Sequence, residues 1–234
     1  MGSLAVLMVA TPIFGLSLQP PDMQAALSPS VQILNIEAAV DVSDAGLSND
    51  GSDEGDSYEA QMKRRNSLAG VHRTFGIATW GAMLLTEVFG TIQYYNLYGT
   101  FSSLENTPCV QGTAVFGQGQ CYGTPWLHLI SGSVTTGLYA TTLTLALMMP
   151  DPDNLSEGKG EFADTLRMHK LLRWIHLGGM VAQVALGVLL ANGTSIGLDR
   201  TNNYSDLRLL ATAHLAAGLV TFGALTWAGA LMVF

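Results

Sequence analysis

The sequence predicts an all-α protein, a transmembrane up-and-down bundle of four helices. Four apolar segments each approach the roughly 20 residues that cross a bilayer core. Only 12% of the 234 residues are charged, about half the roughly 25% of a typical soluble domain. Each segment also carries a histidine near its beginning, an expensive residue at membrane depth. The segments are Leu68–Tyr95, Pro125–Met149, Leu171–Ala191 and Leu209–Phe234.

Two regions precede this bundle, which we assign to residues 67–234. Residues 1–25 contain a shorter apolar run that fits the hydrophobic core of a signal peptide, although it lacks a positive start. The alternative is a short fifth transmembrane helix. Residues 26–66 hold most of the acidic excess behind the net charge of −8, and few apolar residues interrupt it. This composition predicts a disordered acidic linker after the signal-like segment. The sequence has no basic patch that would suggest nucleic-acid binding.

The chain has two cysteines, Cys109 and Cys121, in the Gly-rich loop between the first two apolar segments. Their spacing suits a disulfide that closes a small loop, which would imply an oxidising compartment. Two free thiols are the alternative. Basic residues gather on the face where the first helix starts, which favours a cytoplasmic location for that face. A cleaved signal peptide would reverse this orientation, so the orientation stays open.

The histidines sort by membrane face, because an up-and-down bundle alternates chain direction. His72 and His176 then share one face, and His128 and His214 share the other. Two imidazoles on either side of an iron are what a b-type haem requires. The sequence therefore predicts two bis-histidine haem b sites stacked across the membrane. The alternative is that these histidines only form hydrogen bonds that hold the helices together.

Glycines accompany these histidines at helical spacing. Gly76, Gly132 and Gly218 each follow a histidine by four residues, about one turn. Such a glycine would lie on the face of its histidine and leave room for a macrocycle edge. It could equally allow two helices to approach closely.

The third segment holds a second histidine, His169, seven residues before His176. His169 sits among basic residues that mark the membrane surface, so depth favours His176 as the ligand. We expect His169 to contact a propionate, a quinone headgroup or a redox partner, or to be a solvated interfacial residue. Arg73 is a candidate propionate partner, and Glu87 is an acid inside a span, which suggests a functional role such as proton relay.

One histidine in each of four consecutive helices, pairing first with third and second with fourth, resembles the four-helix core of the cytochrome b561 family. The resemblance covers about residues 68–234 and implies bis-histidine ligation by His72/His176 and His128/His214. It also implies electron transfer across a membrane. The chain departs from eukaryotic members because it lacks a span on each flank of the core, and it shows no ascorbate-site motif.

The expected function is therefore a multi-pass b-type cytochrome of a cell membrane, such as a bacterial inner membrane. Its partners would be lipid, a quinone, and a redox protein or complex, and an oxidoreductase activity with a quinol or soluble donor is open. A rival is a non-haem subunit that anchors or assembles a larger complex. A transition-metal transporter is less favoured, since paired carboxylates and broken helices are missing.

Overall fold

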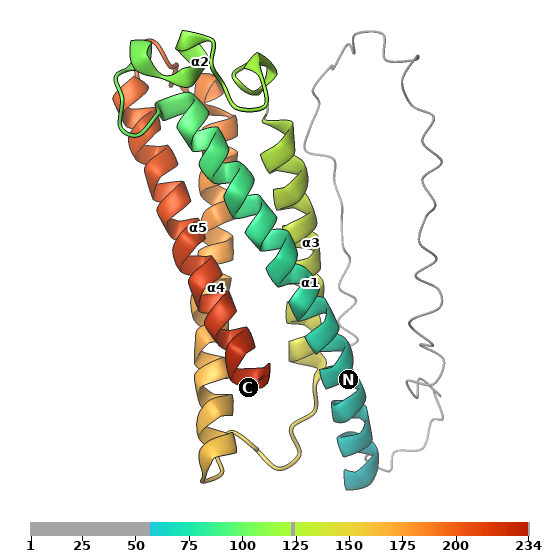
Figure 1. Ribbon diagram of the computed structural model, residues 1–234. Coiled ribbons are helices and arrows are strands. Elements are labelled where there is room, and N and C mark those ends of the chain that lie inside the picture. Colours follow the sequence, from blue (N-terminus) through green and yellow to red (C-terminus); the bar gives the residue numbers. More distant parts are fainter. Residues whose placement is uncertain (1–56, 123–124, 234) are drawn as a thin grey trace, which may run out of the picture. The chain divides into compact units, whose positions relative to one another are not determined.

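The computed structural model describes residues 57–122 and 125–233. In this part of the chain the protein is helical and contains no strand. Four long helices run up and down, with short helices in the loops between them (Figure 1). The expected signal segment and residues 26–56 of the acidic linker lie outside the described residues. The long helices are α1 (Tyr58–Tyr98), α3 (Trp126–Met148), α4 (Glu161–Ala191) and α5 (Tyr204–Val233).

The helices extend beyond the apolar segments from which they were predicted. Helix α1 begins at Tyr58, so the expectation of a linker reaching residue 66 needs correction. Ser57 caps it by accepting a hydrogen bond from the backbone N–H of Ala60 at 3.3 Å, as helix N-termini require. Helix α4 likewise starts ten residues before Leu171. Apolar composition marks the part of a helix that can lie in hydrocarbon, whereas capping residues decide where the helix begins.

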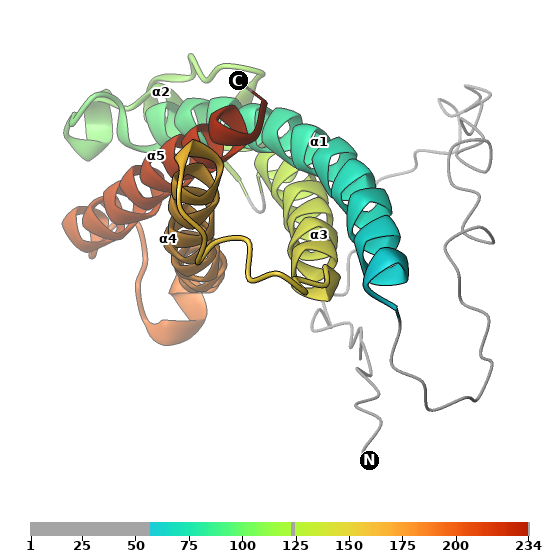
Figure 2. The same cartoon turned by 90° about the horizontal axis from the view of Figure 1, so that it is seen from below.

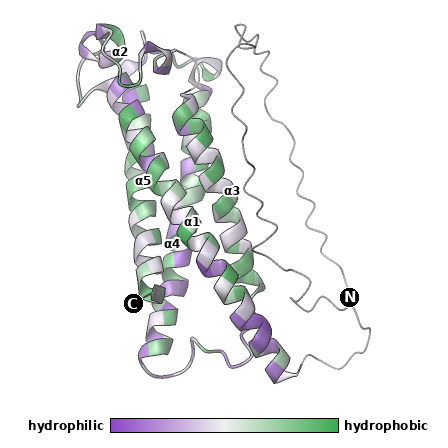
Figure 3. Cartoon of the chain, turned by 45° about the vertical axis from the view of Figure 1, so that its right-hand side comes forward, coloured by the Kyte–Doolittle hydropathy of each residue, from purple (hydrophilic) through white to green (hydrophobic). Residues whose placement is uncertain are grey.

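Three of the long helices, α1, α4 and α5, are long and apolar enough to span a membrane. Hydrophobic residues follow the middle of the helices, and hydrophilic residues gather toward their ends (Figure 3). Helix α3 is 23 residues long and falls below that level of apolarity because it carries several serines and threonines.

The bundle is built from two hairpins. Helix α1 packs closely on α3, α4 packs closely on α5, and α1 and α5 join the two hairpins. Figure 2 looks along these helices. Helices α3 and α4 meet through side chains in the centre, where Met83, Tyr139 and Met180 form a buried cluster.

Hydroxyl groups lock α1 to α3. Thr79 is fully buried, and its Oγ1 lies 3.0 Å from Oγ1 of Thr142. A second pair, Thr86 and Thr135, meets at 2.9 Å. Small polar side chains let two helices approach closely while their hydroxyls stay hydrogen-bonded.

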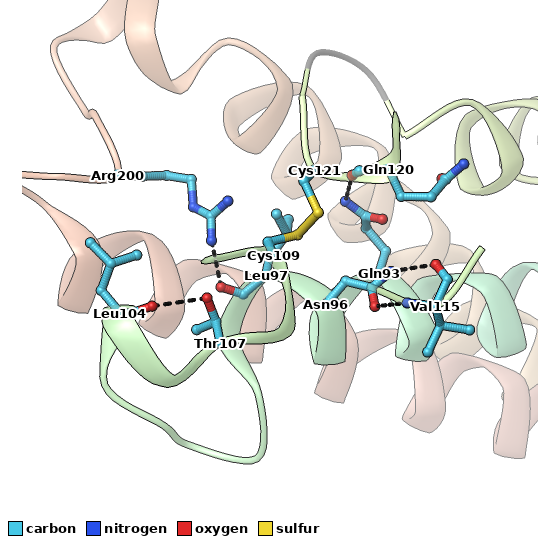
Figure 4. The surroundings of a disulfide bond; sticks show 10 residues. All are labelled: Gln93, Asn96, Leu97, Leu104, Thr107, Cys109, Val115, Gln120, Cys121 and Arg200. Carbon is cyan, nitrogen blue, oxygen red and sulfur yellow. Dashed lines mark hydrogen bonds between the residues drawn. A yellow bond between two sulfur atoms is a disulfide. The ribbon is translucent and has the colours of Figure 1, made fainter. Parts of the chain in front are cut away.

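The loop between α1 and α3 is folded against the end of α1 (Figure 4). Cys109 and Cys121 form a disulfide. The buried Asn96 donates to the carbonyl of Val115 at 3.0 Å and accepts from its N–H at 2.8 Å. Gln93 donates to the carbonyl of Gln120 at 2.9 Å. The polar residues at the end of α1 therefore serve to fix this loop.

At the opposite end, Asp151 ties the α3–α4 loop to two helices. Its carboxylate lies 3.0 Å from Nζ of Lys170 on α4 and 3.4 Å from Arg65 on α1. Partial burial raises the pKa of Asp151, but the hydrogen bonds from Lys170 and the Leu155 N–H and the charges of Lys170 and Arg65 outweigh it. The net result is a pKa below the ordinary value of 3.8.

We predict that Asp151→Asn lowers the thermal stability of the full chain at pH 7, by about 1 kcal/mol, as partly exposed ion pairs do. A lowered pKa stabilises the fold above the unfolded-state pKa, and this contribution disappears as pH falls through the folded-state pKa. The difference in melting temperature should therefore shrink below pH 4. The exposed Glu157→Gln is the control, and an equal loss there would contradict this assignment.

Candidate functional site: two histidine pairs across the bundle

Four histidine side chains form two pairs across the bundle. The rings of His72 on α1 and His169 on α4 have centroids 6.3 Å apart. The rings of His128 on α3 and His214 on α5 have centroids 5.9 Å apart. Each pair joins helices from different hairpins, and the two pairs lie toward opposite ends of the bundle.

Backbone carbonyls fix three of these rings. The Nδ1–H of His72 donates to the carbonyl of Thr142 at 3.0 Å, and that of His169 donates to the carbonyl of Ala228 at 3.0 Å. The Nδ1–H of His128 donates to the carbonyl of Thr86 at 3.2 Å. A carbonyl oxygen can only accept, so the proton of each neutral ring sits on Nδ1. The lone pair of Nε2 is then free to bind a metal.

The spacing of the rings suits a shared metal. With metal–nitrogen bonds of about 2.0 Å and each ring centroid about 1 Å behind its nitrogen, two imidazoles on opposite sides of one ion have centroids about 6 Å apart. Among the described residues, no three His, Cys, Asp or Glu side chains gather as a metal site. A haem needs only two protein ligands, because its porphyrin supplies the other four. The donor set therefore fits haem iron.

The two hairpins repeat one another in sequence. The segment His128–Gly137 reads HLISGSVTTG, and His214–Gly223 reads HLAAGLVTFG, identical at six of ten positions. Residues of α1 correspond to residues 97 positions later in α4: His72 with His169, Gly81 with Gly178, Met83 with Met180, and Gly90 with Gly187.

The repeat extends to the contacts of the histidines. His72 bonds to the carbonyl of Thr142, fourteen residues after His128, and His169 bonds to that of Ala228, fourteen after His214. His128 and His214 each pack against a glycine of their partner helix. At 1.5 Å per residue, fourteen residues place the two histidine pairs roughly 20 Å apart along the bundle.

The expected partner of His72 requires a correction, because the structure brings His72 against His169 instead of His176. The depth argument counted from the apolar segments. Counting from the helix starts gives the same wrong level, because His72 lies 14 residues after the start of α1 and His169 lies only eight residues after the start of α4. The two helices are therefore offset along the bundle, and this offset brings the basic belt around His169 to the level of His72. The repeat was the signal in the sequence that could have identified His169, since His169 corresponds to His72 whereas His176 does not.

His176 has a different partner. It is 7% exposed, and its Nδ1 lies 2.8 Å from the hydroxyl of Tyr139 on α3. In the repeat, His176 corresponds to Thr79, and Tyr139 corresponds to Leu225. The contact between α3 and α4 therefore contains a hydrogen-bonded pair that the equivalent positions of α5 and α1 lack.

The glycines that face the histidine rings are not the expected ones. A Cβ at Gly90 would lie 2.9 Å from Cε1 of His128, and one at Gly187 would lie 3.4 Å from Cε1 of His214. Gly76 and Gly132 instead face threonines of the neighbouring helix. Helical side chains lean toward the N-terminus, so a glycine one turn after a histidine lies behind the ring.

The remaining candidates occupy separate places. Gly218 lies against Glu87, whose Oε1 would be 2.7 Å from a Cβ there, so Glu87 fills the space that this glycine leaves between α1 and α5. Arg73 is exposed. The buried Nδ1 of His214 has no hydrogen-bond partner among the described residues, whereas Gln183 donates to the His214 carbonyl at 2.5 Å.

An open groove lies at the end of the bundle that carries the disulfide loop, and no histidine of the described residues lines it. Its volume is about 560 Å³, within the roughly 300–1,000 Å³ of small-molecule sites. The lining is apolar and aromatic except for one amide, and it comes from Phe89, Phe116, Gly119, Gln120, Trp126 and Leu127.

Comparison with known proteins provides no relative: no family model, no curated protein and no solved structure matches the chain.

We predict that Gly90→Ala destabilises the protein, by about 1–3 kcal/mol, because the new methyl group would overlap the His128 ring and overpacking costs that much. Gly76→Ala is the matched control in the same helix, since its nearest contact is 4.0 Å away and alanine favours helix. Thermal unfolding of both variants in detergent tests this. Equal melting temperatures would show that Gly90 does not seat the ring.

Proposed function

We propose that this protein is a membrane b-type cytochrome that carries electrons between two haems. His72 and His169 would hold one haem, and His128 and His214 the other. The observation that supports this most is the repeated histidine pairing: both hairpins carry histidines at equivalent positions, and each histidine meets its counterpart across the bundle. Three of the four rings also bond to a backbone carbonyl of the neighbouring helix. The resemblance to the cytochrome b561 core, which rests on the same pattern of one histidine in each helix, implies the same function.

We further propose that α3 is a fourth transmembrane span. All seven serine and threonine hydroxyls of α3 are hydrogen-bonded within the protein, mostly to the carbonyl one turn earlier. Such bonded hydroxyls no longer need water, so this helix is less polar than its composition suggests. The bonded residues are Ser131, Ser133, Thr135, Thr136, Thr141, Thr142 and Thr144.

In this proposal the protein performs three tasks. The carbonyls of Thr142, Ala228 and Thr86 orient the rings and keep Nε2 unprotonated, as second-shell partners of metal-bound histidines do. The apolar helices exclude water from both sites. The two histidine pairs lie roughly 20 Å apart along the bundle axis, so electrons would pass along that axis. The bound haems would supply the one-electron chemistry, and a quinone or redox protein as donor or acceptor stays a prediction from the sequence.

A non-haem anchor subunit would explain the histidine–carbonyl hydrogen bonds as helix-joining contacts. It would not explain why the rings meet in pairs at ligand spacing while their Nε2 atoms stay free. The pairing therefore favours the cytochrome.

The test is the reduced-minus-oxidised spectrum of the purified full chain with its haem content. We expect a b-type α-band and two haems per chain. His128→Ala and His214→Ala should each remove one haem and leave the other, since each variant lacks one of the two histidines that would hold that haem. A preparation without a Soret band, or full haem content in both variants, would disprove the cytochrome.

A further inference from the structure

The face that carries His72 and His169 contains an arginine that forms no ion pair within the described part of the chain. Arg173 lies on α4, one turn after His169, and is only partly exposed. Its Nε is buried and has no hydrogen-bond partner among the described residues. A buried, unpartnered guanidinium nitrogen is costly, so a partner from outside the described residues is expected.

The neighbouring cations differ from Arg173. Among the described residues, Arg65 and Lys170 share the carboxylate of Asp151, and Arg167 pairs with Asp164. Arg173 belongs to none of these ion pairs, and its guanidinium carbon lies 5.1 Å from the ring centre of the adjacent Trp174. The protein therefore satisfies the other partly buried cations of this face and leaves one available.

Arg173 shares a face of α4 with His169, which lies one helical turn earlier. Its charge also acts on His169 and His176 of its own helix and on Tyr139 of α3. Helical side chains lean toward the N-terminus of their helix, which brings the guanidinium back toward the level of His169. The equivalent position in α1 is Gly76, so α1 carries no charged side chain at that position.

We propose that Arg173 binds an anionic carboxylate of the cofactor held by His72 and His169, a haem propionate. The inference rests on the proposed function. A guanidinium pairs with a carboxylate through two parallel N–H···O bonds, and the anion would satisfy the buried Nε. Arg173 thus replaces the exposed Arg73 as the cation expected to hold a propionate.

The test measures haem loss from the full chain in nanodiscs to an excess of a haem-scavenging globin. We expect Arg173→Gln to release one of the two haems about tenfold faster, since a charge-assisted hydrogen bond is lost. Arg173→Lys should restore part of the retention, and Arg73→Gln is the matched control that should not change it. In a redox titration, Arg173→Gln should also lower the midpoint potential of one haem, because a nearby positive charge favours the reduced iron.

Haem dimethyl ester identifies the anion. The wild-type chain loaded with the ester should lose it faster, and Arg173→Gln should add no further effect, because the two changes remove one interaction. If Arg173→Gln accelerates release of the ester as much as of haem, the propionate is not the partner. If its effect depends instead on phosphatidylglycerol in the nanodisc, the partner is a lipid phosphate and the inference is wrong. Two tightly held haems with no effect of Arg173→Gln would refute this inference alone, whereas a chain without haem would refute the proposed function.

Discussion

The hydrogen bond from a histidine Nδ1–H to a carbonyl of the neighbouring helix is the interaction on which this architecture depends. It joins the two helices of a hairpin, places the ring proton on Nδ1 and leaves the lone pair of Nε2 free. The bond exists only where the helices are close, and the threonine contacts of α1 with α3 provide that closeness. Packing within each hairpin and the meeting of the histidine rings between hairpins are thus one constraint, and a change to either should affect both.

The repeat explains why the two pairs resemble each other, and its interruptions explain how they differ. Near the first pair, Arg173, His176 and Tyr139 replace the Gly76, Thr79 and Leu225 of the equivalent positions. Near the second pair, Glu87 lies against Gly218. A cation at one end and a carboxyl group at the other make the electrostatic environments of the two sites unequal. In the proposed cytochrome, this asymmetry would give electrons a preferred direction along the bundle.

Much of the fold could be predicted from the sequence, because long apolar segments and one histidine in each are visible without coordinates. The disulfide of Cys109 and Cys121 could also be predicted, because both cysteines lie in one loop of the sequence. The helix ends could not be predicted from apolarity, since α1 and α4 continue through charged residues. Choosing between His169 and His176 required the level of one helix against another. Only the register of the repeat encodes that level in the sequence, and it becomes evident once contacts identify the matching positions.

The most direct test of the central claim compares the two histidines of α4. Haem per chain should fall from two to one in His169→Ala, because His72 loses its partner across the bundle. It should stay at two in His176→Ala, which removes only the hydrogen bond to Tyr139. One haem in His176→Ala and two in His169→Ala would contradict the pairing on which this account is built.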